Sequence, residues 1–324
     1  LPGSHGNAVY RPEGGTVAFV NAIVAAIEAS GGSVRTGARV VGIKRDDEMT
    51  KVELEDGEAV FARHVVSSLD VRRTVGLLDS PPRELSAAAA SVRSGALNVA
   101  ELKVDLALSV PASVLGGDSD AALWMLQERP DSLHTSFGEI VAGDLPTSSA
   151  MMWAAPSALD PSAAPSGGGT VWLSAFVPAR LKDRPWDRSV EEEAAERMLD
   201  GFAKIVGTDL RPFIVDRRIT GPAGWEQRIG SALGSPNHID LTLDQLFGWR
   251  PPGVAGYRTA LPWLYLTGAG TFPGGGVSGI PGRNAAQALL GDLGSRPRRT
   301  HRLRREMRGL WDAWGLYRSM RRRI

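Results

Sequence analysis

The sequence feature that most constrains the fold is a glycine-rich loop late in the chain, GAGTFPGGGVSGIPG at residues 268–282. The apolar run WLYLT before it predicts a buried parallel strand over 263–267. RNAAQALLGDL after it predicts a helix over 283–293. In such a strand, glycine loop and helix, backbone amides and the helix N-terminus can contact an anionic or strongly polar ligand. Glycine suits this role because a Cβ would hold the ligand away from the backbone.

On its residues alone the loop leaves two interpretations open, a ligand-binding turn and an ordinary glycine-proline connection. A G-x-G pair is a weak signal by itself. The loop also differs from the dinucleotide fingerprint G-x-G-x-x-G, because Pro273 occupies the place of the third glycine. Further segments of the chain are needed to decide.

The first 75 residues predict an α/β unit. Gly14 and Gly15 open a segment with apolar residues at helical spacing, and glycines at 31–32 close it. A strand follows in SVRTGARVVGIKRDD, then a hairpin around Asp56-Gly57, and then a buried strand over 64–67. The apolar positions that predict the helix are Val17, Val20, Ile23, Val24 and Ile27.

The middle of the chain, residues 76–222, predicts an α+β domain inserted into the first unit. Strands in LNVAELKVDLAL, GTVWLSAFVPA and FIVDRRITGP and a helix in SVEEEAAERMLDGFAKIVG do not alternate strictly. We expect that helix to begin with a capping box of Ser189 and Glu192. Residues 223–295 then return to the first domain.

Several segments resemble the phytoene-desaturase-like FAD oxidoreductases, within a larger group that includes the amine oxidases. LYLTGAGTFPGGGVSGIPGRNAA looks like the family's C-terminal flavin motif. YRPEGGTVAFVNAI, RTGARVVGI and ARHVVSSLD resemble the part that leads through the adenine-contacting strand. GWEQRIG and NHIDLTLDQLFGWRPPGVAGYRT are similar to the branch of pyridine nucleotide-disulfide oxidoreductase domain-containing protein 2. The resemblance implies an α/β, FAD/NAD(P)-binding Rossmann-like domain of the glutathione-reductase type, split into residues 1–75 and 223–295, with residues 76–222 as substrate domain.

Carried over position by position, the resemblance implies FAD as cofactor and assigns its contacts to three turns and one strand. One turn lies near the flavin, a strand residue meets the adenine, and two turns meet the ribitol phosphate and the isoalloxazine. Ala269 replaces an acidic residue of many amine-oxidase-type members, which puts a side-chain contact to the ribitol in doubt. The implied residues are Gly14, Gly15, Thr16, Val40, Gly268, Ala269, Gly270, Thr271, Gly275, Gly276, Val277 and Gly279.

The family's N-terminal strand, G-x-G-x-x-G turn and helix, which hold the ADP part of FAD, have no counterpart in this sequence. We expect the sequence to lack an N-terminal portion, so that the fold is incomplete there. The alternative is a chain that lost its nucleotide site or obtains it from elsewhere.

The expected chemistry follows from the implied flavin position. A helix that begins near residues 279–283 would direct its positive end at the flavin N1 and C2 carbonyl, where negative charge develops on hydride acceptance. The cofactor performs the redox step, and the protein supplies orientation and electrostatics. No catalytic residue is assigned.

Few side chains suggest a general base, and we expect none. His238 is expected to lie in a turn or to cap a helix. Arg250 and Arg258 are expected in salt bridges, with orientation of a polar substrate group as the alternative. Trp225 and Glu226 are expected to supply packing and a surface charge.

Composition excludes several other classes of site. Without cysteine the chain has no disulfide and no thiolate nucleophile, and its five histidines are too scattered for a metal site. No run of about 18 apolar residues could span a bilayer. The first residues lack the pattern of a signal peptide, so we expect a cytoplasmic location.

The last segment, residues 296–324, predicts a basic amphipathic helix. It holds eleven arginines against two acidic residues, net +9, which leaves 26 basic and 34 acidic residues in the rest of the chain. We expect this tail to bind the inner face of a membrane; docking on the acidic body and disorder are the alternatives. Nucleic-acid binding is not expected, since no recognition motif accompanies the charge. The apolar stripe is Leu303, Met307, Leu310, Trp314 and Tyr317.

Together these features predict a FAD-dependent oxidoreductase of the dehydrogenase or desaturase type, which moves a hydride from a hydrophobic small molecule to flavin. Two alternatives stay open, a non-catalytic remnant or interaction module of the same fold and a FAD-dependent amine oxidase. The substrate, the electron acceptor and the oligomeric state are left open by the sequence.

Overall fold

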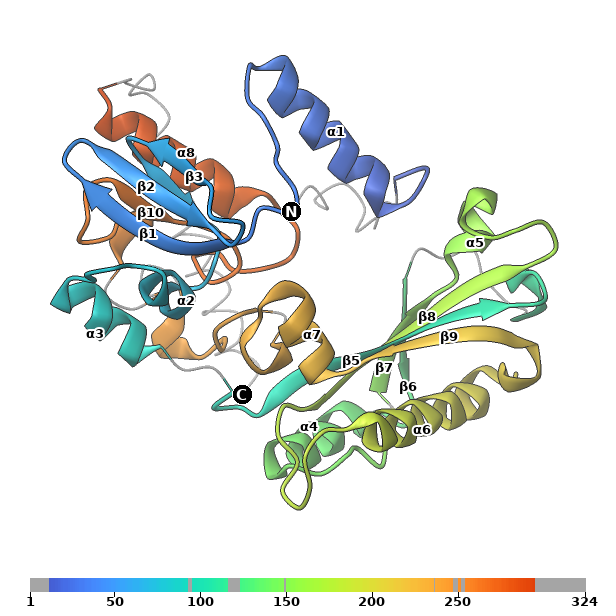
Figure 1. Ribbon diagram of the computed structural model, residues 1–324. Coiled ribbons are helices and arrows are strands. Elements are labelled where there is room, and N and C mark those ends of the chain that lie inside the picture. Colours follow the sequence, from blue (N-terminus) through green and yellow to red (C-terminus); the bar gives the residue numbers. More distant parts are fainter. Residues whose placement is uncertain are drawn as a thin grey trace, which may run out of the picture.

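The computed structural model describes residues 12–92, 95–115, 123–148, 150–235, 237–246, 250–251 and 254–294. The fold is mixed α/β, with three sheets of strand order β1-β2-β3, β10-β4 and β6-β7-β8-β5-β9 (Figure 1). Short 3-10 turns connect the main elements: η2 (Ala112–Leu115), η3 (Pro161–Ala163), η4 (Arg211–Phe213), η5 (Ala232–Gly234), η6 (Leu243–Gln245) and η8 (Ala255–Tyr257). The tail predicted over 296–324 lies outside the described residues.

The chain is described from just before α1 (Thr16–Ala29), and the helix predicted after Gly15 is confirmed. The helix buries none of its residues. Five of its large apolar side chains are exposed, from 39% at Ile27 to 61% at Val17, and Val24 is half-buried. Helical spacing therefore predicted the element correctly, while the apolar face lies open in this structure.

The antiparallel sheet that follows consists of β1 (Val40–Asp46), β2 (Met49–Leu54) and β3 (Ala59–Ala62). The hairpin predicted at Asp56-Gly57 joins β2 to β3. Gly57 has a φ of +88°, and the Asp56 carboxylate accepts a hydrogen bond from the amide of Glu58. These contacts are the local turn chemistry that the Asp-Gly pair indicates.

Strands far apart in the sequence form the second sheet. β4 (Val65–Ser67) pairs in parallel with β10 (Leu264–Leu266), and β10 is buried at all three residues. The sheet extends at both ends, because the amide of Val65 donates to Trp263 and that of Thr267 to Ser67, each at 2.8 Å. The buried parallel strand predicted from WLYLT is confirmed, and its pairing sets the glycine loop beside the end of β4.

A core cluster surrounds this pair of strands and includes α2 (Val71–Gly76) and α3 (Arg83–Ser91). Its buried members come from both ends of the described chain: Ile43, Val71, Leu78, Leu85, Ala88, Ala89, Val92, Ile239, Val254, Leu264 and Leu266. The predicted domain boundary at residue 76 stays a prediction. The side chains from Leu78 to Val92 nevertheless pack with this cluster rather than with the large sheet.

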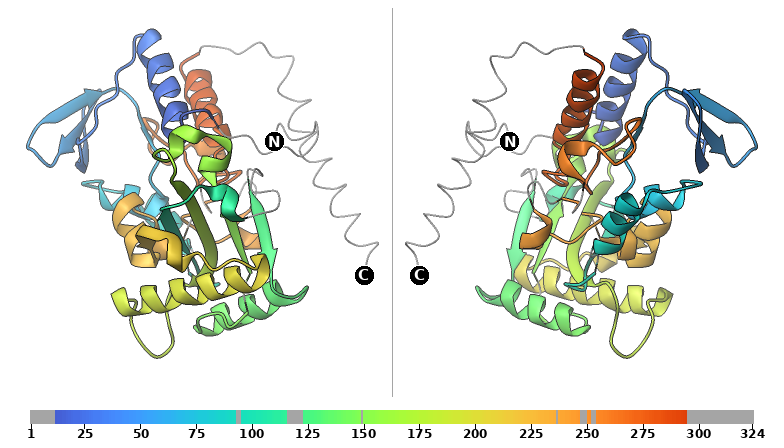
Figure 2. Two further views of the ribbon diagram at one scale, coloured as in Figure 1. Left: turned by 90° about the vertical axis from the view of Figure 1, so that its right-hand side faces the viewer. Right: turned by 90° about the vertical axis from the view of Figure 1, so that its left-hand side faces the viewer.

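The large antiparallel sheet contains β5 (Val99–Leu108), β6 (Trp124–Gln127), β7 (Ala150–Ala154), β8 (Gly169–Pro178) and β9 (Ile214–Thr220). Helices α4 (Ser132–Ala142) and α6 (Arg188–Val206) lie on one side of it, and the short α5 (Pro156–Leu159) follows β7. Helices α1 and α8 (Ile280–Asp292) lie beyond its opposite side, while α7 (Pro222–Ile229) follows β9 (Figures 1 and 2).

Side-chain alternation explains how this sheet packs. In β5 every second residue is fully buried, from Ala100 to Leu108, and joins the core cluster beneath α6. The intervening residues, among them Glu101, Lys103 and Asp105, are half-buried on the other face. Period-two burial is expected of a sheet covered by helices on one side.

The start of α6 differs from the sequence prediction. Asp187 is the N-cap, and its carboxylate accepts a hydrogen bond from the amide of Val190 at 2.9 Å. The predicted capping box of Ser189 and Glu192 is therefore wrong. Glu192 lies one turn inside the helix and pairs with Arg188 and Arg217. Because the helix begins at Arg188, the residue in the N-cap position is Asp187, and Ser189 lies inside the first turn.

Candidate functional site: the glycine loop after strand β10

The loop after β10 packs directly against the segment that follows β4. Gly268 has a φ of +84°, and a Cβ on it would lie 2.6 Å from the carbonyl oxygen of Ser68. A Cβ built on Gly270 would lie 3.5 Å from the Cα of Asp70, which is an ordinary van der Waals contact. Gly268 is thus required by the protein's own backbone, since the parallel pairing of β4 and β10 brings the two segments together.

The next turn of the loop is fixed by hydrogen bonds. The amide and the hydroxyl of Thr271 both donate to the carbonyl of Gly268, at 3.0 and 2.9 Å. The hydroxyl of Tyr257 donates to the carbonyl of Phe272 and accepts from the side-chain amide of Asn284 on α8, each at 2.7 Å. Tyr257 therefore ties the loop to the helix, a role that no local sequence signal indicated.

The loop ends at the N-terminus of α8. Gly274, Gly276 and Gly279 have φ of +101°, +97° and +65°, and a Cβ at Gly276 or Gly279 would meet no atom within 4 Å. Gly279 is the N-cap and has no side chain to cap the helix, while Ser278 Oγ accepts from the amide of Ile280 at 3.3 Å. Val277 is 89% exposed at a φ of +52°. In contrast to Gly268, these positions leave open space beside the backbone at the positive end of a helix.

The side chain of Arg250 holds the start of the glycine loop through hydrogen bonds. It is 97% buried (3% exposed), and its guanidinium donates to main-chain carbonyls rather than to carboxylates. Nη2 and Nε reach the carbonyl of Ala269 at 2.9 and 3.3 Å, and the other acceptors are the carbonyls of Asn237, Ile239, Asp240 and Gln245. Burial lowers the pKa of Arg250 to about 10, and the charge of Asp240 opposes that shift. The prediction of a salt bridge is wrong for Arg250, because it holds carbonyl oxygens of a loop that lacks regular hydrogen bonds.

Asp240 continues this network toward the large sheet. Its carboxylate is buried and accepts hydrogen bonds from the amides of Gly95 and Ala96 at 2.9 and 2.7 Å. These residues lie a few positions before the start of β5 at Val99. Arg250 contacts the carbonyls of Ala269 and Asp240, and the Asp240 carboxylate contacts the amides before β5. Arg250 and Asp240 therefore connect the glycine loop to the large sheet.

His238 and Asp70 flank Gly270. The Cβ of His238 would lie 4.0 Å from a Cβ built on that glycine. Burial lowers the pKa of His238; the Arg250, Arg73 and Arg72 charges act in the same direction and Asp70 opposes them. Asp70 caps α2 by accepting from the amides of Arg72 and Arg73. His238 has a φ of +63° within a turn, so the turn prediction is confirmed.

The other side chains considered from the sequence have structural partners. Arg258 forms a two-point ion pair with Asp292, at 2.8 and 2.9 Å, and the pKa of Arg258 is raised by this hydrogen bond. The salt-bridge prediction for Arg258 is confirmed. Glu226 lies 3.6 Å from Arg73 and is half exposed, which is the expected surface charge.

The turn at Gly14 and Gly15 contacts a different segment. The amide of Gly14 donates to the Asp160 carboxylate at 2.8 Å, and Gly15 is the N-cap of α1 with a φ of +79°. Hydrogen bonds from Ser162 and then Gly14 lower the pKa of Asp160. Val40 begins β1 opposite Leu54. Within the described residues no hydrogen bond joins this turn to the loop after β10, so the structure joins 268–279 to β4 but leaves Gly14 and Val40 separate from it.

Two buried oxygen atoms test whether the loop suits a polar ligand. Thr267 Oγ1, directly before Gly268, and Asp70 Oδ2, beside Gly270, have no hydrogen-bond partner among the described residues. Groups left without hydrogen bonds on the inside of a protein are costly unless a ligand or water meets them. The Asp70 carboxylate can only accept hydrogen bonds, so these two atoms fit a ligand group with hydrogen-bond donors, such as a hydroxyl of a flavin nucleotide.

A sequence profile described as flavin containing amine oxidoreductase matches residues 3–290. The chain belongs to this family of flavin-containing amine oxidoreductases.

Among the described residues no group of three or more histidine, cysteine or acidic side chains could hold a metal ion. No helix within the described ranges is long and apolar enough to cross a bilayer.

Two curated relatives illustrate the similarity. The chain is 29% identical over 299 residues to pyridine nucleotide-disulfide oxidoreductase domain-containing protein 2 of Rattus norvegicus, covering 87% of this chain and 51% of the relative. It is 31% identical over 285 residues to a lycopene-forming phytoene desaturase of Pseudescherichia vulneris, covering 87% and 56%. The chain thus spans about half the length of the curated relatives it matches.

Solved structures share the fold. An oxidoreductase of Methanosarcina mazei aligns with a TM-score of 0.53 at 16% identity, over 86% of this chain and 55% of that one. Putrescine oxidase bound to putrescine aligns with a TM-score of 0.50 at 15% identity, over 88% and 54%. At these identities the likeness concerns the fold alone.

Proposed function

We propose that the chain supplies the flavin side of an FAD-dependent oxidoreductase that takes a hydride from a hydrophobic substrate. The observation that carries this proposal is the loop after β10, whose Gly276 and Gly279 leave open space beside the N-terminus of α8. Membership of a flavin-containing family supports FAD as the ligand. The bound flavin would supply the hydride acceptor.

The residues proposed to hold FAD are those of the glycine turns and one strand. Gly275, Gly276, Val277 and Gly279 would present backbone amides to the flavin ring, and the α8 N-terminus would stabilise negative charge on it. Gly268 is required for backbone packing. Together with Gly270 it would place Ala269 and Thr271 near the ribitol phosphate. Gly14, Gly15, Thr16 and Val40 would complete the site from α1 and β1.

A further segment of protein is proposed to cover α1. The exposed apolar face of α1 supports it, because a group of large apolar side chains that are 39% to 61% exposed is typical of a surface that binds another segment of protein. A strand, G-x-G-x-x-G turn and helix for the ADP part of FAD would belong to that segment. The large sheet from β5 to β9 would then be a substrate domain inserted between β4 and β10.

The half-buried face of the large sheet is proposed to face the substrate. Lys103 donates to Asp105 at 2.6 Å and lies 5.6 Å from the ring centre of Trp172. Ser174 donates to Glu101 at 2.5 Å. A hydrophobic substrate would contact Trp172, while these paired polar groups would meet a polar end of the molecule. The desaturase relatives support a substrate of this kind.

Anaerobic bleaching of the bound flavin tests the reaction. Full-length protein loaded with FAD should lose visible absorbance when an acyclic polyene in detergent is added, and it should not respond to putrescine. Bleaching and hydrogen peroxide release with amines alone would favour an amine oxidase. FAD binding without bleaching by any candidate donor would favour a non-catalytic module of the same fold.

Membrane association through residues 296–324 is proposed as a separate property. Eleven arginines in this segment support attraction to an anionic surface. Deletion of 296–324 should abolish sedimentation with anionic vesicles. Equal sedimentation of the deleted and the intact protein would contradict this proposal.

A further inference from the structure

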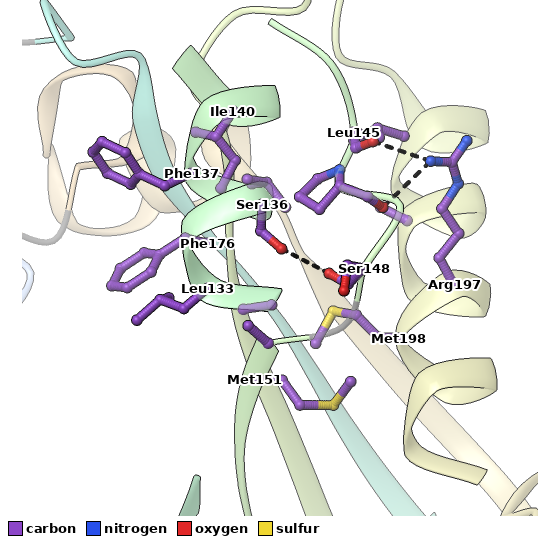
Figure 3. Close-up of a pocket in the computed structure, with 15 residues that line it drawn as sticks. Leu133, Ser136, Phe137, Ile140, Leu145, Ser148, Met151, Phe176, Arg197 and Met198 are labelled. Atoms are coloured by element: carbon purple, nitrogen blue, oxygen red, sulfur yellow. Dashed lines mark hydrogen bonds between the residues drawn. The ribbon is translucent and has the colours of Figure 1, made fainter. Parts of the chain in front are cut away.

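A small cavity among α4, α6, β7 and β8 has a volume of about 50 Å³ (Figure 3). This is about a third of the roughly 150 Å³ that holds one benzene molecule. Its hydroxyls are already paired, since Ser136 donates to the carbonyl of Ser148 and Ser148 to the hydroxyl of Ser132, each at 2.7 Å. This cavity therefore offers no room for a ring and no free hydroxyl.

A larger pocket lies where the segment after β8 meets α7. Its volume is about 350 Å³, within the range of pockets that bind small organic molecules. One wall is formed by residues between 179 and 186, and the other by Pro222, Ala223 and Glu226 of α7 with Leu233 of η5. None of the lining residues belongs to the glycine loop, so this pocket is separate from the proposed flavin site.

Hydrogen bonds fix the wall that follows β8. The amide of Arg180 donates to the side-chain oxygen of Asn98, and the Asn98 side-chain amide donates back to the Arg180 carbonyl, each at 2.8 Å. The indole nitrogen of Trp186 donates to the carbonyl of Pro178 at 2.9 Å. Because its only donor is used in this way, the Trp186 indole presents apolar surface to the pocket.

The shape of the pocket suits a compact ring system. Besides Trp186, its apolar lining includes Leu181, Pro185, Pro222 and Leu233. Two proline rings and an indole lose little side-chain freedom when a ligand binds. The volume is more than twice the roughly 150 Å³ that holds benzene, so it admits two fused rings.

One charged side chain of the pocket lacks a counter-ion. Among the described residues the guanidinium of Arg180 has no hydrogen-bond acceptor and no carboxylate partner. The other charged side chains are paired, Arg184 with Glu193 at 2.6 Å and Glu226 with Arg73 at 3.6 Å. An arginine carries five N–H donors, and a carboxylate matches its planar group with two parallel hydrogen bonds. The pocket therefore calls for a carboxylate at Arg180.

Glu226 limits the charge that the ligand can carry. It lines the pocket from α7, on the wall opposite the segment that holds Arg180. A second negative charge on the ligand would be repelled by this carboxylate. A monoanion, with its carboxylate at Arg180 and an uncharged body, avoids that repulsion.

We propose that this pocket binds a small aromatic monocarboxylate of about two fused rings. The carboxylate pairs with Arg180, and the rings lie against Trp186 and the two prolines. The ligand bridges the segment after β8 and α7, and α7 is in turn paired with α2 through Glu226 and Arg73. The site uses no residue of the flavin site, so the proposal does not depend on the proposed function.

Isothermal titration calorimetry of the intact protein with 2-naphthoate tests the proposal. The titration is made with and without saturating FAD, because the empty flavin site is itself a place for a planar ring. Binding should be saturable at one site per chain and unchanged by FAD. 2-Naphthamide has nearly the same shape without the charge, and it should bind about tenfold more weakly.

Matched arginine variants locate the carboxylate. Arg180→Gln keeps the main-chain hydrogen bonds to Asn98 and should remove the preference for naphthoate over naphthamide. Arg180→Lys should retain only part of that preference, because it lacks the two-point geometry. Arg188→Gln is the control, since Arg188 pairs with Glu192 two residues after Trp186 and does not line the pocket. It should retain the whole preference.

Matched leucine variants locate the rings. Ala223→Leu adds side-chain volume inside the pocket and should weaken naphthoate binding by about tenfold or more. Gln227→Leu places the same side chain one turn further along α7, outside the pocket lining, and should leave binding unchanged. Both positions are exposed, and thermal melting of each variant confirms the fold.

Several results would overturn the proposal. These are the absence of saturable binding, equal affinity of naphthoate and naphthamide, an unchanged preference in Arg180→Gln, and wild-type affinity in folded Ala223→Leu. Displacement of naphthoate by FAD would place it in the flavin site and would contradict the proposal equally. Protein that binds naphthoate as expected but never binds FAD would contradict the proposed function and leave this inference intact.

Discussion

Nη2 of Arg250 lies 2.9 Å from the carbonyl oxygen of Ala269, and this contact fixes the first turn of the glycine loop to the segment at 237–246. The guanidinium contacts five carbonyl oxygens in total, and the amide of Phe272 donates back to the Arg250 carbonyl at 3.1 Å. A single buried side chain thereby replaces the regular hydrogen bonds that this part of the chain lacks.

Replacing Arg250 should destabilise the protein. Arg250→Met leaves buried carbonyls without donors and should lower the free energy of unfolding by about 3 kcal/mol. Arg250→Lys keeps the charge but offers fewer donors in a different geometry, so it should recover only part of the loss. Urea unfolding of both variants measures the effect. Equal stability of Arg250→Met and wild type would show that the carbonyls find other partners.

Two glycines of the loop should respond differently to alanine. Gly268→Ala and Gly276→Ala both place a side chain at positive φ, which costs about 1–2 kcal/mol. Only Gly268→Ala also drives a Cβ into the Ser68 carbonyl, which should cost about 1–3 kcal/mol more. Gly276→Ala should instead lower FAD affinity. Chemical unfolding without FAD and a separate FAD titration compare the two. The same stability loss in both variants would argue against the close approach at Gly268.

Stability should depend on His238 in mildly acidic solution. The folded-state pKa of His238 is lowered by burial, so below about pH 6.5 the unfolded chain takes up a proton that the folded chain does not. Stability should therefore fall as the pH drops from about 6.5 toward the folded-state pKa. Asparagine also tolerates a positive φ and does not titrate, so His238→Asn should lose less stability between these two pH values than the wild type does. Unfolding curves at about pH 7.5 and about pH 5 test it, and parallel behaviour of variant and wild type would contradict it.

The ion pair between Arg258 and Asp292 should contribute little. Their side chains are 43% and 40% exposed, so water screens the attraction despite its two-point geometry. Asp292→Asn should lower the free energy of unfolding by less than about 1 kcal/mol, and added salt should reduce the difference. A loss above about 2 kcal/mol, unaffected by salt, would show that the hydrogen bond from Tyr265 to Asp292 carries more weight than the charges.

Local chemistry predicted the elements that frame the candidate site. The helix after Gly15, the hairpin at Asp56-Gly57 and the strand that became β10 follow from short-range spacing and turn residues. The family resemblance placed the glycine loop in a flavin context, and the match over residues 3–290 agrees with it. The individual FAD contacts, the inserted domain and its boundaries stay predictions.

Contacts between residues far apart in the chain were not predicted from the sequence. The residues around Arg250 do not indicate that its side chain donates a hydrogen bond to the carbonyl of Ala269. Nor do the residues around Asp240 indicate that its carboxylate accepts a hydrogen bond from the amide of Gly95. Tyr257 clamps Phe272 to α8 for the same reason. The cap of α6 was missed because Ser189 lies inside the first turn, and the residue before the helix that accepts from Val190 is Asp187. The apolar spacing of α1 predicted the helix but not that most of these side chains are exposed.

The amount of FAD held by purified full-length protein tests the central claim most directly. Denaturation should release FAD equimolar with the protein, and Gly276→Ala should reduce that amount while the fold, checked by circular dichroism, stays intact. Protein that folds but retains no flavin, even after incubation with excess FAD, would contradict the assignment of the glycine loop to a flavin site.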